Sequence, residues 1–387
     1  MREDECSTWI EMLQTVPDPR AARGCRYPWT ALLTLICAAL VSEQQSAEAM
    51  AQWIAEHAAE WQSWVWTPRG GVPSAATIRR ALCHVNVQAL EARLGAWTQA
   101  CMATDVAATG VADAVRGVAV DGKAVRGAQA HGAQVHLVSL VTQQQAQVLG
   151  QVAVAEKRNE IPAVRELLRG RDLTGWLVTL DAMHTQRETA DLILAQGGHY
   201  LMVVKGNQPD LHTALAEWFA EDAWAEEQEA RVTTCDVGHG RHEHRTLIRR
   251  RVDTHLLGWP GAQQALQRST WAQVLPQGVE RHEVTYAVTS LPPNRYPPAA
   301  LEAAWRGHWG IENQVHYVRD VTLGEDAGQA HLGSTPQALA ALRNGLLSLL
   351  RRQGYTRIAH TLRHLGASVA RALRFLGCSP LTLDRRL

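Results

Sequence analysis

Hydrophobic and polar positions repeat with two different periods along this chain of 387 residues. In residues 1–105 the apolar side chains recur at helical spacing, as in Met50, Ile54 and Trp61, and nothing there alternates like a strand. From Val111 onward the pattern changes to alternating, β-branched segments that are typical of strands. The two patterns predict an all-helical N-terminal domain at 1–105, followed by an α/β domain.

The alternating part predicts three successive strands joined by polar turns, and then helices and strands in turn. The strands are expected at 115–120, 135–142, 146–154, 175–180 and 200–204, and the helices at 160–168 and 186–195. Three antiparallel strands followed by helix, strand, helix and strand form the element order of a ribonuclease H-like core. The predicted fold class is therefore α/β with such a core.

One stretch interrupts this alternation. It reads as an acidic helix at 211–230 and then as strand-like segments at 231–235, 242–252, 273–274 and 284–289. We interpret it as a mostly β insertion at about 208–296, placed between the fifth core strand and a helix that begins near Pro298. With this insertion the core makes a second domain at 111–330.

The formal net charge is zero, but the charge is distributed unevenly. Residues 331–387 contain nine arginines, no lysine and one acid, and they are predicted to form a basic helical C-terminal segment. Such a segment suits a polyanion, because neutralised phosphates release counterions. An arginine-rich helical face in solvent would give the same pattern.

A second DNA-binding element is suggested in the N-terminal domain. The breaker-rich loop Thr67–Pro73 precedes a helix that presents Thr77, Arg79 and Arg80, so helix, loop and helix could read DNA. An ordinary helical bundle that packs on the next domain fits these residues equally well.

The apolar runs and the cysteines of the sequence indicate the cellular compartment. The longest apolar run, Trp29–Val41, is shorter than the ~20 residues that a bilayer span needs, so no membrane partner is expected. Seven cysteines without a Cys-x-x-Cys pair favour a reducing cytoplasm and argue against a zinc ribbon.

Three acidic residues are the candidates for chemistry. Asp121 and Asp181 each follow a strand-like run, and Glu312 belongs to a later helix that could pack against the same sheet edge. Clustered carboxylates suit a hard cation, which predicts Mg²⁺, with Mn²⁺ as a substitute. They also repel one another, so a metal-free site should have raised pKa values. Taken singly, Asp121 could begin a hairpin turn, Asp181 could cap a helix and Glu312 could be a surface acid.

The motifs around these acids are far more specific than any acid alone. They read Asp121-Gly122-Lys123, Asp181-Ala182-Met183-His184-Thr185-Gln186 and His308-Trp309-Gly310-Ile311-Glu312-Asn313. With Val204-Lys205-Gly206-Asn207-Gln208, Lys157–Pro162 and the start at Leu13–Trp29, they make the chain resemble the DDE transposases of bacterial insertion sequences, in particular the family that includes the H-repeat-associated proteins. The resemblance runs from about Trp9 to about Leu346.

The resemblance implies a function and a set of ligands. Asp121, Asp181 and Glu312 would be the metal ligands in a two-metal mechanism. The reaction would cleave phosphodiester bonds at the ends of an element and join the 3′-hydroxyl to target DNA, in a homo-oligomeric complex. The presence of all three acids argues against a catalytically dead relic. The alternatives are a host-retained DNA nuclease that no longer moves an element and a non-catalytic DNA-binding regulator.

Related transposases often place Tyr, Arg, Glu and Lys around the last acid, and this chain departs from that pattern. The corresponding residues are Trp305, His308, Glu312 and Arg319. Arg319 keeps the final basic position, whereas His308 could contact phosphate as an arginine does only while it is protonated.

Other residues are expected to contact the substrate. Lys205 and Asn207 follow a strand beside Asp181 and could orient the scissile phosphate, although a plain helix start is the alternative. Arg241 and Arg245 are expected to reach DNA phosphate, with His239 and His242 nearby. Further DNA-contacting candidates from the matching motifs are Lys123, His184 and Asn313. A zinc site at His242 and His244 is the less favoured interpretation, because a fourth ligand is hard to name.

Overall fold

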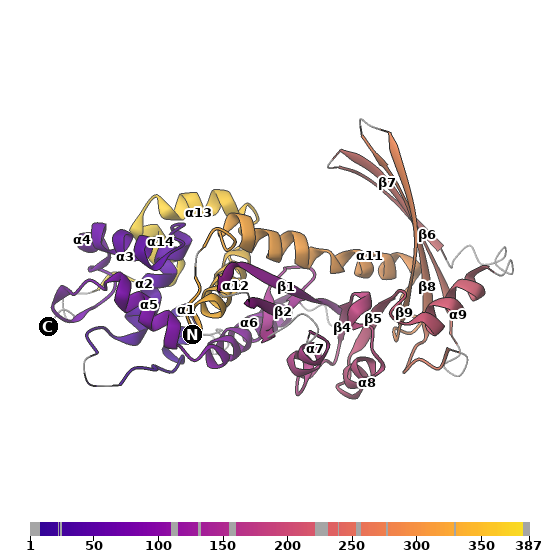
Figure 1. Ribbon diagram of the computed structural model, residues 1–387, viewed down its shortest axis with the longest axis horizontal. Helices are drawn as coiled ribbons and strands as arrows, with labels where there is room; N and C mark the ends of the chain where they lie inside the picture. The colour runs from indigo at the N-terminus through magenta and orange to yellow at the C-terminus, as the bar shows by residue number, and fades with distance from the viewer. Residues whose placement is uncertain are drawn as a thin grey trace.

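The molecule is elongated, with helices at one end, a β-sheet through the middle and a projecting β-ribbon at the other end (Figure 1). The computed structural model describes residues 8–21, 23, 25–109, 115–130, 133–154, 160–220, 231–238, 240–252, 257–275, 278–328 and 330–381. Among the expected features, Lys157 to Asn159, residues 221–230, His239 and the last arginines, Arg385 and Arg386, lie outside these residues.

One nine-stranded mixed sheet organises the chain, in the order β3-β2-β1-β4-β5-β9-β8-β7-β6. The first five strands along the chain are β1 (Arg116–Ala130), β2 (Ala133–Thr142), β3 (Val148–Val154), β4 (Trp176–Leu180) and β5 (His199–Val204). β1, β2 and β3 pair antiparallel, whereas β1 pairs with β4, and β4 with β5, in parallel. The antiparallel pairing of the first three strands agrees with the three successive strands predicted from the alternation of apolar residues.

β1 is longer than predicted. The expected strand stopped at Val120, but β1 continues past Asp121, which pairs with Ser139 of β2. The extension carries Asp121-Gly122-Lys123, a sequence that reads as a turn because it is polar and contains glycine. Strand pairing with β2 overrides that local signal. The prediction that Asp121 ends its strand was therefore wrong.

Helices cover the two faces of the sheet. α7 (Glu160–Leu168), α8 (Arg187–Ala195) and α9 (Pro209–Ala220) share a core with the apolar face that contains Val118 and Val120. α11 (Pro298–His308) covers the opposite face, where Leu301 and Trp305 pack against Leu177 of β4. Because α11 lies along the face that contains these strands, the segment that follows it reaches β1.

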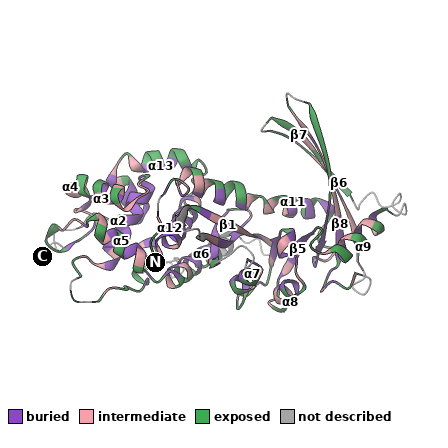
Figure 2. Ribbon diagram, viewed as in Figure 1, coloured by how far each residue is buried: buried purple, intermediate pink, exposed green. Residues whose placement is uncertain are grey.

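The predicted insertion extends the same sheet. After α9 the chain forms β6 (Arg231–Gly238), β7 (Arg241–Arg251), β8 (Gln264–Val274) and β9 (Val279–Thr289), all antiparallel. β9 joins the ribbon to the sheet by pairing with β5. The tip that contains β6 and β7 projects beyond α11 and is largely exposed (Figures 1 and 2).

Two parts of the sequence that are far apart form one helical unit. It contains α1 (Trp9–Gln14), α2 (Trp29–Val41), α3 (Ala47–Glu56), α4 (Ala58–Trp61), α5 (Ala75–His84), α6 (Val87–Thr109), α12 (Thr335–Arg352), α13 (Ile358–Gly366) and α14 (Val369–Phe375). Leu35 of α2, Leu346 of α12 and Leu373 of α14 are fully buried in one shared core.

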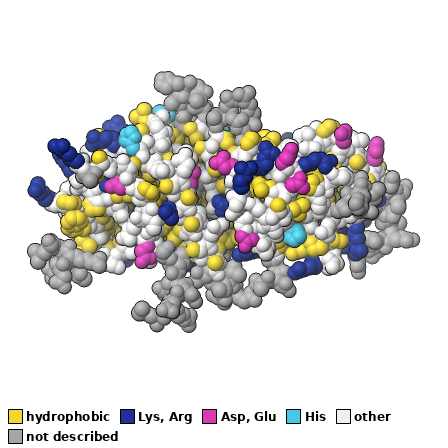
Figure 3. Space-filling view, turned by 90° about the horizontal axis from the view of Figure 1, so that it is seen from below, with side chains coloured by type: hydrophobic (Ala, Val, Ile, Leu, Met, Phe, Trp, Pro, Cys, Tyr) yellow, Lys and Arg dark blue, Asp and Glu magenta, His cyan; other side chains and the backbone are white. Residues whose placement is uncertain are grey.

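The basic C-terminal segment is thus partly structural. Arg343 is buried in α12, and Arg351 donates hydrogen bonds to the carbonyl oxygens of Ala146 and Gln314. In contrast, Arg357, Arg363, Arg371 and other arginines of the segment are exposed. On the face shown in Figure 3, Lys and Arg side chains are interspersed with Asp and Glu. Only the exposed arginines are available to a polyanion.

Candidate active site

Two of the predicted acids lie side by side at the end of a parallel strand pair. The last paired residues of β1 and β4 are Val120 and Leu180, and each is followed directly by an aspartate. Asp121 continues β1, whereas Asp181 begins the turn before the short helix Ala182–His184. The parallel register therefore brings together two residues that are 60 positions apart in sequence.

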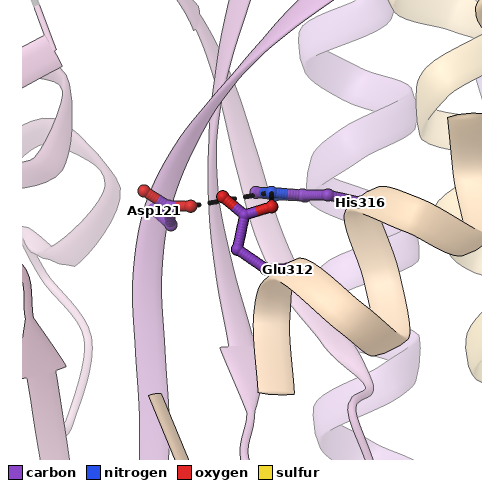
Figure 4. Close-up of side chains that lie close together, drawn as sticks. All are labelled: Asp121, Glu312 and His316. Atoms are coloured by element: carbon purple, nitrogen blue, oxygen red, sulfur yellow. Dashed lines mark ion pairs between the residues drawn. The ribbon is translucent and has the colours of Figure 1, made fainter. Parts of the chain in front are cut away.

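The third acid comes from the segment after α11. Here the helix widens into two π-helical turns, Glu312–His316 and Val318–Thr322. Such wide turns occur often at functional sites. The first of them presents Glu312 and His316 on the side that faces Asp121 (Figure 4).

Asp121, Glu312 and His316 form a compact set of donor atoms. One ligand atom from each lies within 4.8 Å of the others. Nδ1 of His316 is 3.6 Å from Oδ2 of Asp121 and 3.5 Å from Oε2 of Glu312. Among the residues that the structure describes, this is the one group of three His, Cys, Asp or Glu residues close enough to share a metal ion. His316 follows Glu312 by four residues, and this helical spacing could have marked it as a ligand candidate.

Asp181 lies next to this set without belonging to it. Its side chain is exposed, and its charge acts on the pKa values of Asp121, His184 and His308. The structure therefore brings Asp121 and Glu312 within ligand distance of each other and leaves Asp181 at the open side of the site.

The pKa values of Asp121 and Glu312 are those of neighbouring carboxylates whose charge no cation compensates. Burial, together with the charges of Glu312 and Asp181, raises the pKa of Asp121 to about 8. The hydrogen bond from His316 holds the pKa of Glu312 below its usual value. A protonated Asp121 thus donates to an ionised Glu312. The expected raised pKa is found for Asp121, while that of Glu312 is shifted in the opposite direction.

His308 is held as a neutral imidazole. The hydroxyl of Thr179 donates to the carbonyl oxygen of Val118 at 3.0 Å, so it can only accept from Nδ1 of His308, 3.1 Å away. Burial lowers the pKa of His308 despite the nearby charge of Asp181. With the proton on Nδ1, the neutral ring keeps an acceptor at Nε2. Desolvation of the charged ring therefore outweighs the attraction of the neighbouring carboxylates.

Several other candidates are buried or occupied. His184 is only 1 % exposed, and burial lowers its pKa to about 4, which places it beneath the site rather than against DNA. The side-chain amide of Asn207 donates to the carbonyl oxygen of Ala182, so it braces the turn after Asp181. Lys205 and Asn313 are exposed and remain open to substrate.

Two basic candidates belong to an internal ion cluster. Arg319 has no exposed surface, and its guanidinium pairs with Glu325 at 2.6 Å. Nζ of Lys123 pairs with Asp320 and lies 3.9 Å from Glu325. Neither cation projects from the molecular surface.

A groove of about 700 Å³ separates the β6–β9 ribbon from the segment that contains Glu312. Its lining includes Arg241, Arg245, Arg268, Arg306, Trp309 and Asn313. Asp236 holds two of these arginines, because it pairs with Arg306 at 2.7 Å and also with Arg245. The ribbon therefore presents the predicted Arg241 and Arg245 toward the same side of the molecule as Glu312.

The alternative zinc site in the ribbon lacks a set of ligands. Nδ1 of His244 lies 3.0 Å from Sγ of Cys235, and its ring packs against Trp271. In the described part of the chain no third donor joins this pair.

The described part of the chain also contains no helix with the length and apolar character to span a membrane.

Two protein families match this chain. The family described as "Transposase DDE domain" matches residues 114–344, and the one described as "DDE_Tnp_1-associated" matches residues 10–98. The first match contains all three acids of the site.

Curated relatives carry similar names. "Putative transposase YncI" of Escherichia coli O157:H7 is 28% identical over 352 residues, which cover 88% of this chain and 87% of that protein. "H repeat-associated putative transposase YhhI" of Escherichia coli K12 is 29% identical over 220 residues, 55% of this chain and 57% of that protein. A solved structure of a piggyBac transposase synaptic complex with hairpin DNA aligns with a TM-score of 0.44 at 8% identity, over 97% of this chain and 79% of that chain.

Proposed function

Because this chain belongs to the DDE transposase family, we propose that it is a metal-dependent DNA transposase of an insertion-sequence element. It cleaves phosphodiester bonds at the ends of the element and joins the 3′-hydroxyl to target DNA. The observation that carries this proposal is the convergence of Asp121 and Glu312 beside Asp181. The protein acts on DNA in the cytoplasm, as a homo-oligomer in the active complex.

We assign the five strands β1 to β5, with α7 and α8, to a ribonuclease H-like core. The order β3-β2-β1-β4-β5, with antiparallel β1–β3 and parallel β1, β4 and β5, supports this assignment. The ribbon then is the insertion, and residues 1–105 form a helical domain in which Arg79 and Arg80, both exposed on α5, are available to DNA.

The donor set fits a divalent cation. Two carboxylates and an imidazole converge, and the raised pKa of Asp121 reflects charge that a cation would compensate. Asp121, Asp181 and Glu312 would hold Mg²⁺, and the imidazole of His316 makes Mn²⁺ an effective substitute. When bound, two such ions supply an activated hydroxyl or water nucleophile and neutralise the leaving oxygen.

The remaining residues orient the DNA and manage protons. Neutral His308 offers Nε2 as a hydrogen-bond acceptor beside Asp181, where the nucleophile must lose a proton. Lys205 is exposed beyond β5, on the Asp181 side, and can orient the scissile phosphate. The groove lined by Arg241, Arg306 and Asn313 binds the DNA backbone next to the acids.

A cleavage assay separates this function from its alternatives. Labelled duplexes that end in the inverted repeats flanking the gene are incubated with the full chain in Mg²⁺, and binding is measured in parallel in EDTA. Joining of the cleaved 3′ end to a second duplex supports a transposase. Cutting without joining points to a nuclease, and binding without cutting points to a regulator. The double variant Asp121→Asn/Glu312→Gln is the control for contaminating nuclease.

A further inference from the structure

A single buried carboxylate lies at the centre of an ion cluster beside the acids. The side chain of Glu325 is only 1 % exposed, and three cations surround it. Arg319 binds both of its oxygens, at 3.1 and 2.6 Å. Arg343 lies 3.7 Å from Oε2, and Lys123 lies 3.9 Å from Oε1. We call these four residues the Glu325 cluster.

The cluster joins the elements that carry the acids. Lys123 lies two residues after Asp121 on β1, and alternation along a strand puts the two side chains on the same face. Arg319 belongs to the second π-helical turn, directly after the turn that contains Glu312 and His316. Arg343 belongs to α12, whose side chains pack in the core of the helical unit. Glu325 therefore connects the strand of one acid to the helix of another.

All three nitrogens of the Arg319 guanidinium donate to buried protein groups. Its Nε and Nη2 donate to Glu325, and its Nη1 donates to Oε1 of Gln151 on β3 at 3.1 Å. Gln151 in turn accepts from Asn344 of α12 at 2.7 Å. Because Arg319 is fully buried, a DNA phosphate could reach it only if this network came apart.

Lys123 is also directed inward. Its side chain is 6% exposed, and its ammonium contacts Asp320, a partly exposed residue of the second π-helical turn. The pair is a second bridge between β1 and the helix. Lys123 thus links β1 to the segment after α11 through two acids, Asp320 and Glu325.

We propose that Arg319 and Lys123 are positioning residues that act through Glu325 and Asp320 to hold Glu312 and His316 at ligand distance from Asp121. The inference rests on the proposed metal site and assigns the last basic position of the motif a role other than DNA contact. Residues that orient metal ligands from outside the coordination sphere typically contribute 10–100-fold to metal affinity. Loss of the bidentate pair between Arg319 and Glu325 should therefore lower the affinity for the metal ion and leave the affinity for DNA unchanged.

Arg319→Lys tests the proposal because it keeps the charge that Glu325 needs but cannot form the bidentate pair. Mn²⁺ affinity of the full chain is measured without DNA, from the electron paramagnetic resonance signal of the free ion. DNA affinity is measured separately in EDTA, by fluorescence anisotropy at several salt concentrations. Arg169→Lys makes the same exchange at an exposed position just after α7, outside the proposed metal site and DNA surface, and is the matched control.

We expect Arg319→Lys to bind Mn²⁺ about tenfold more weakly than the wild type. Its DNA affinity and salt dependence in EDTA should equal those of Arg169→Lys and of the wild type. Wild-type Mn²⁺ affinity would overturn the proposal. So would a selective loss of DNA affinity in EDTA with a salt slope reduced by about one unit, the signature of a lost phosphate contact.

Two further variants keep the test decisive. If Arg319→Lys does not fold, Asp320→Asn is the second test, because it breaks the ion pair with Lys123 at a partly exposed position. This variant must also bind Mn²⁺ more weakly than the wild type, and wild-type affinity would refute the proposal. Glu312→Gln reports on the metal site itself. If Glu312→Gln keeps wild-type Mn²⁺ affinity, the proposed function is at fault; if only Glu312→Gln loses affinity, the positioning role alone is refuted.

Discussion

Asp121→Asn should stabilise the metal-free protein although it destroys the metal site. The pKa of Asp121 is raised from 3.8 to about 8 by burial and by the charges of Glu312 and Asp181. Between these values the folded state keeps a proton that the unfolded chain has released, so the free energy of unfolding falls as the pH rises through this window. At ~1.4 kcal/mol per pKa unit, the ceiling is about 6 kcal/mol. The lowered pKa of Glu312 opposes this effect. We therefore expect Asp121→Asn to raise the free energy of unfolding by about 2 kcal/mol.

Urea unfolding in EDTA checks this expectation at about pH 5 and about pH 8.5. The side-chain amide that Asp121→Asn introduces would donate to Glu312 at any pH, as protonated Asp121 does, so the variant should be more stable than the wild type at the higher pH. The difference should shrink by more than half at the lower pH, and Mg²⁺ should stabilise only the wild type. Glu166→Gln, at an exposed acid of α7, is the control. A variant that is no more stable than the wild type in EDTA at either pH would refute the reasoning.

The other predictions concern cleavage and DNA binding. Glu312→Gln and Asp181→Asn should each abolish strand cleavage and keep DNA affinity in EDTA; a wild-type cleavage rate would remove that residue from the site. Replacing the exposed Arg363 or Arg371 by glutamine should lower the slope of log affinity against log salt by about one unit, whereas an unchanged slope would exclude a phosphate contact. Because burial keeps His308 neutral, the rate of cleavage should not fall between about pH 7 and pH 9. An alkaline loss that His308→Arg restores would show that the imidazolium is the active form.

The core of the fold could be read from the sequence because its strands are buried and apolar. β4 and β5 are short runs of apolar residues between turn signals, and their predicted bounds agree closely with the structure. The expected 273–274 covered only the end of β8, which spans Gln264–Val274. The middle of β8 contains Gln267, Arg268, Ser269 and Thr270, which are only partly buried and show no apolar alternation. Its position is fixed by pairing with β7 and β9.

The sequence pointed to the three acids but not to their surroundings. Strand-end positions and the resemblance to a family pointed to Asp121, Asp181 and Glu312, and the parallel register explains why the two aspartates follow the ends of paired strands. The π-helical turns leave no local signature, so the orientation of His316 toward Asp121 was not foreseen. Burial of a cation such as Arg319 depends on Glu325 and on the packing of α12, and both are tertiary effects.

We propose that Asp121 is a ligand of the divalent ion that drives DNA cleavage. Asp121→Cys tests it directly, because a sulfur ligand suits the hard Mg²⁺ poorly and is better tolerated by Mn²⁺. Single-turnover cleavage of a labelled element end is measured for the wild type and for Asp121→Cys in each ion. We predict that the variant is inactive in Mg²⁺ and regains cleavage in Mn²⁺, while the wild type cleaves in both. Cleavage by Asp121→Cys in Mg²⁺ at the wild-type rate would show that Asp121 is not a ligand of this ion.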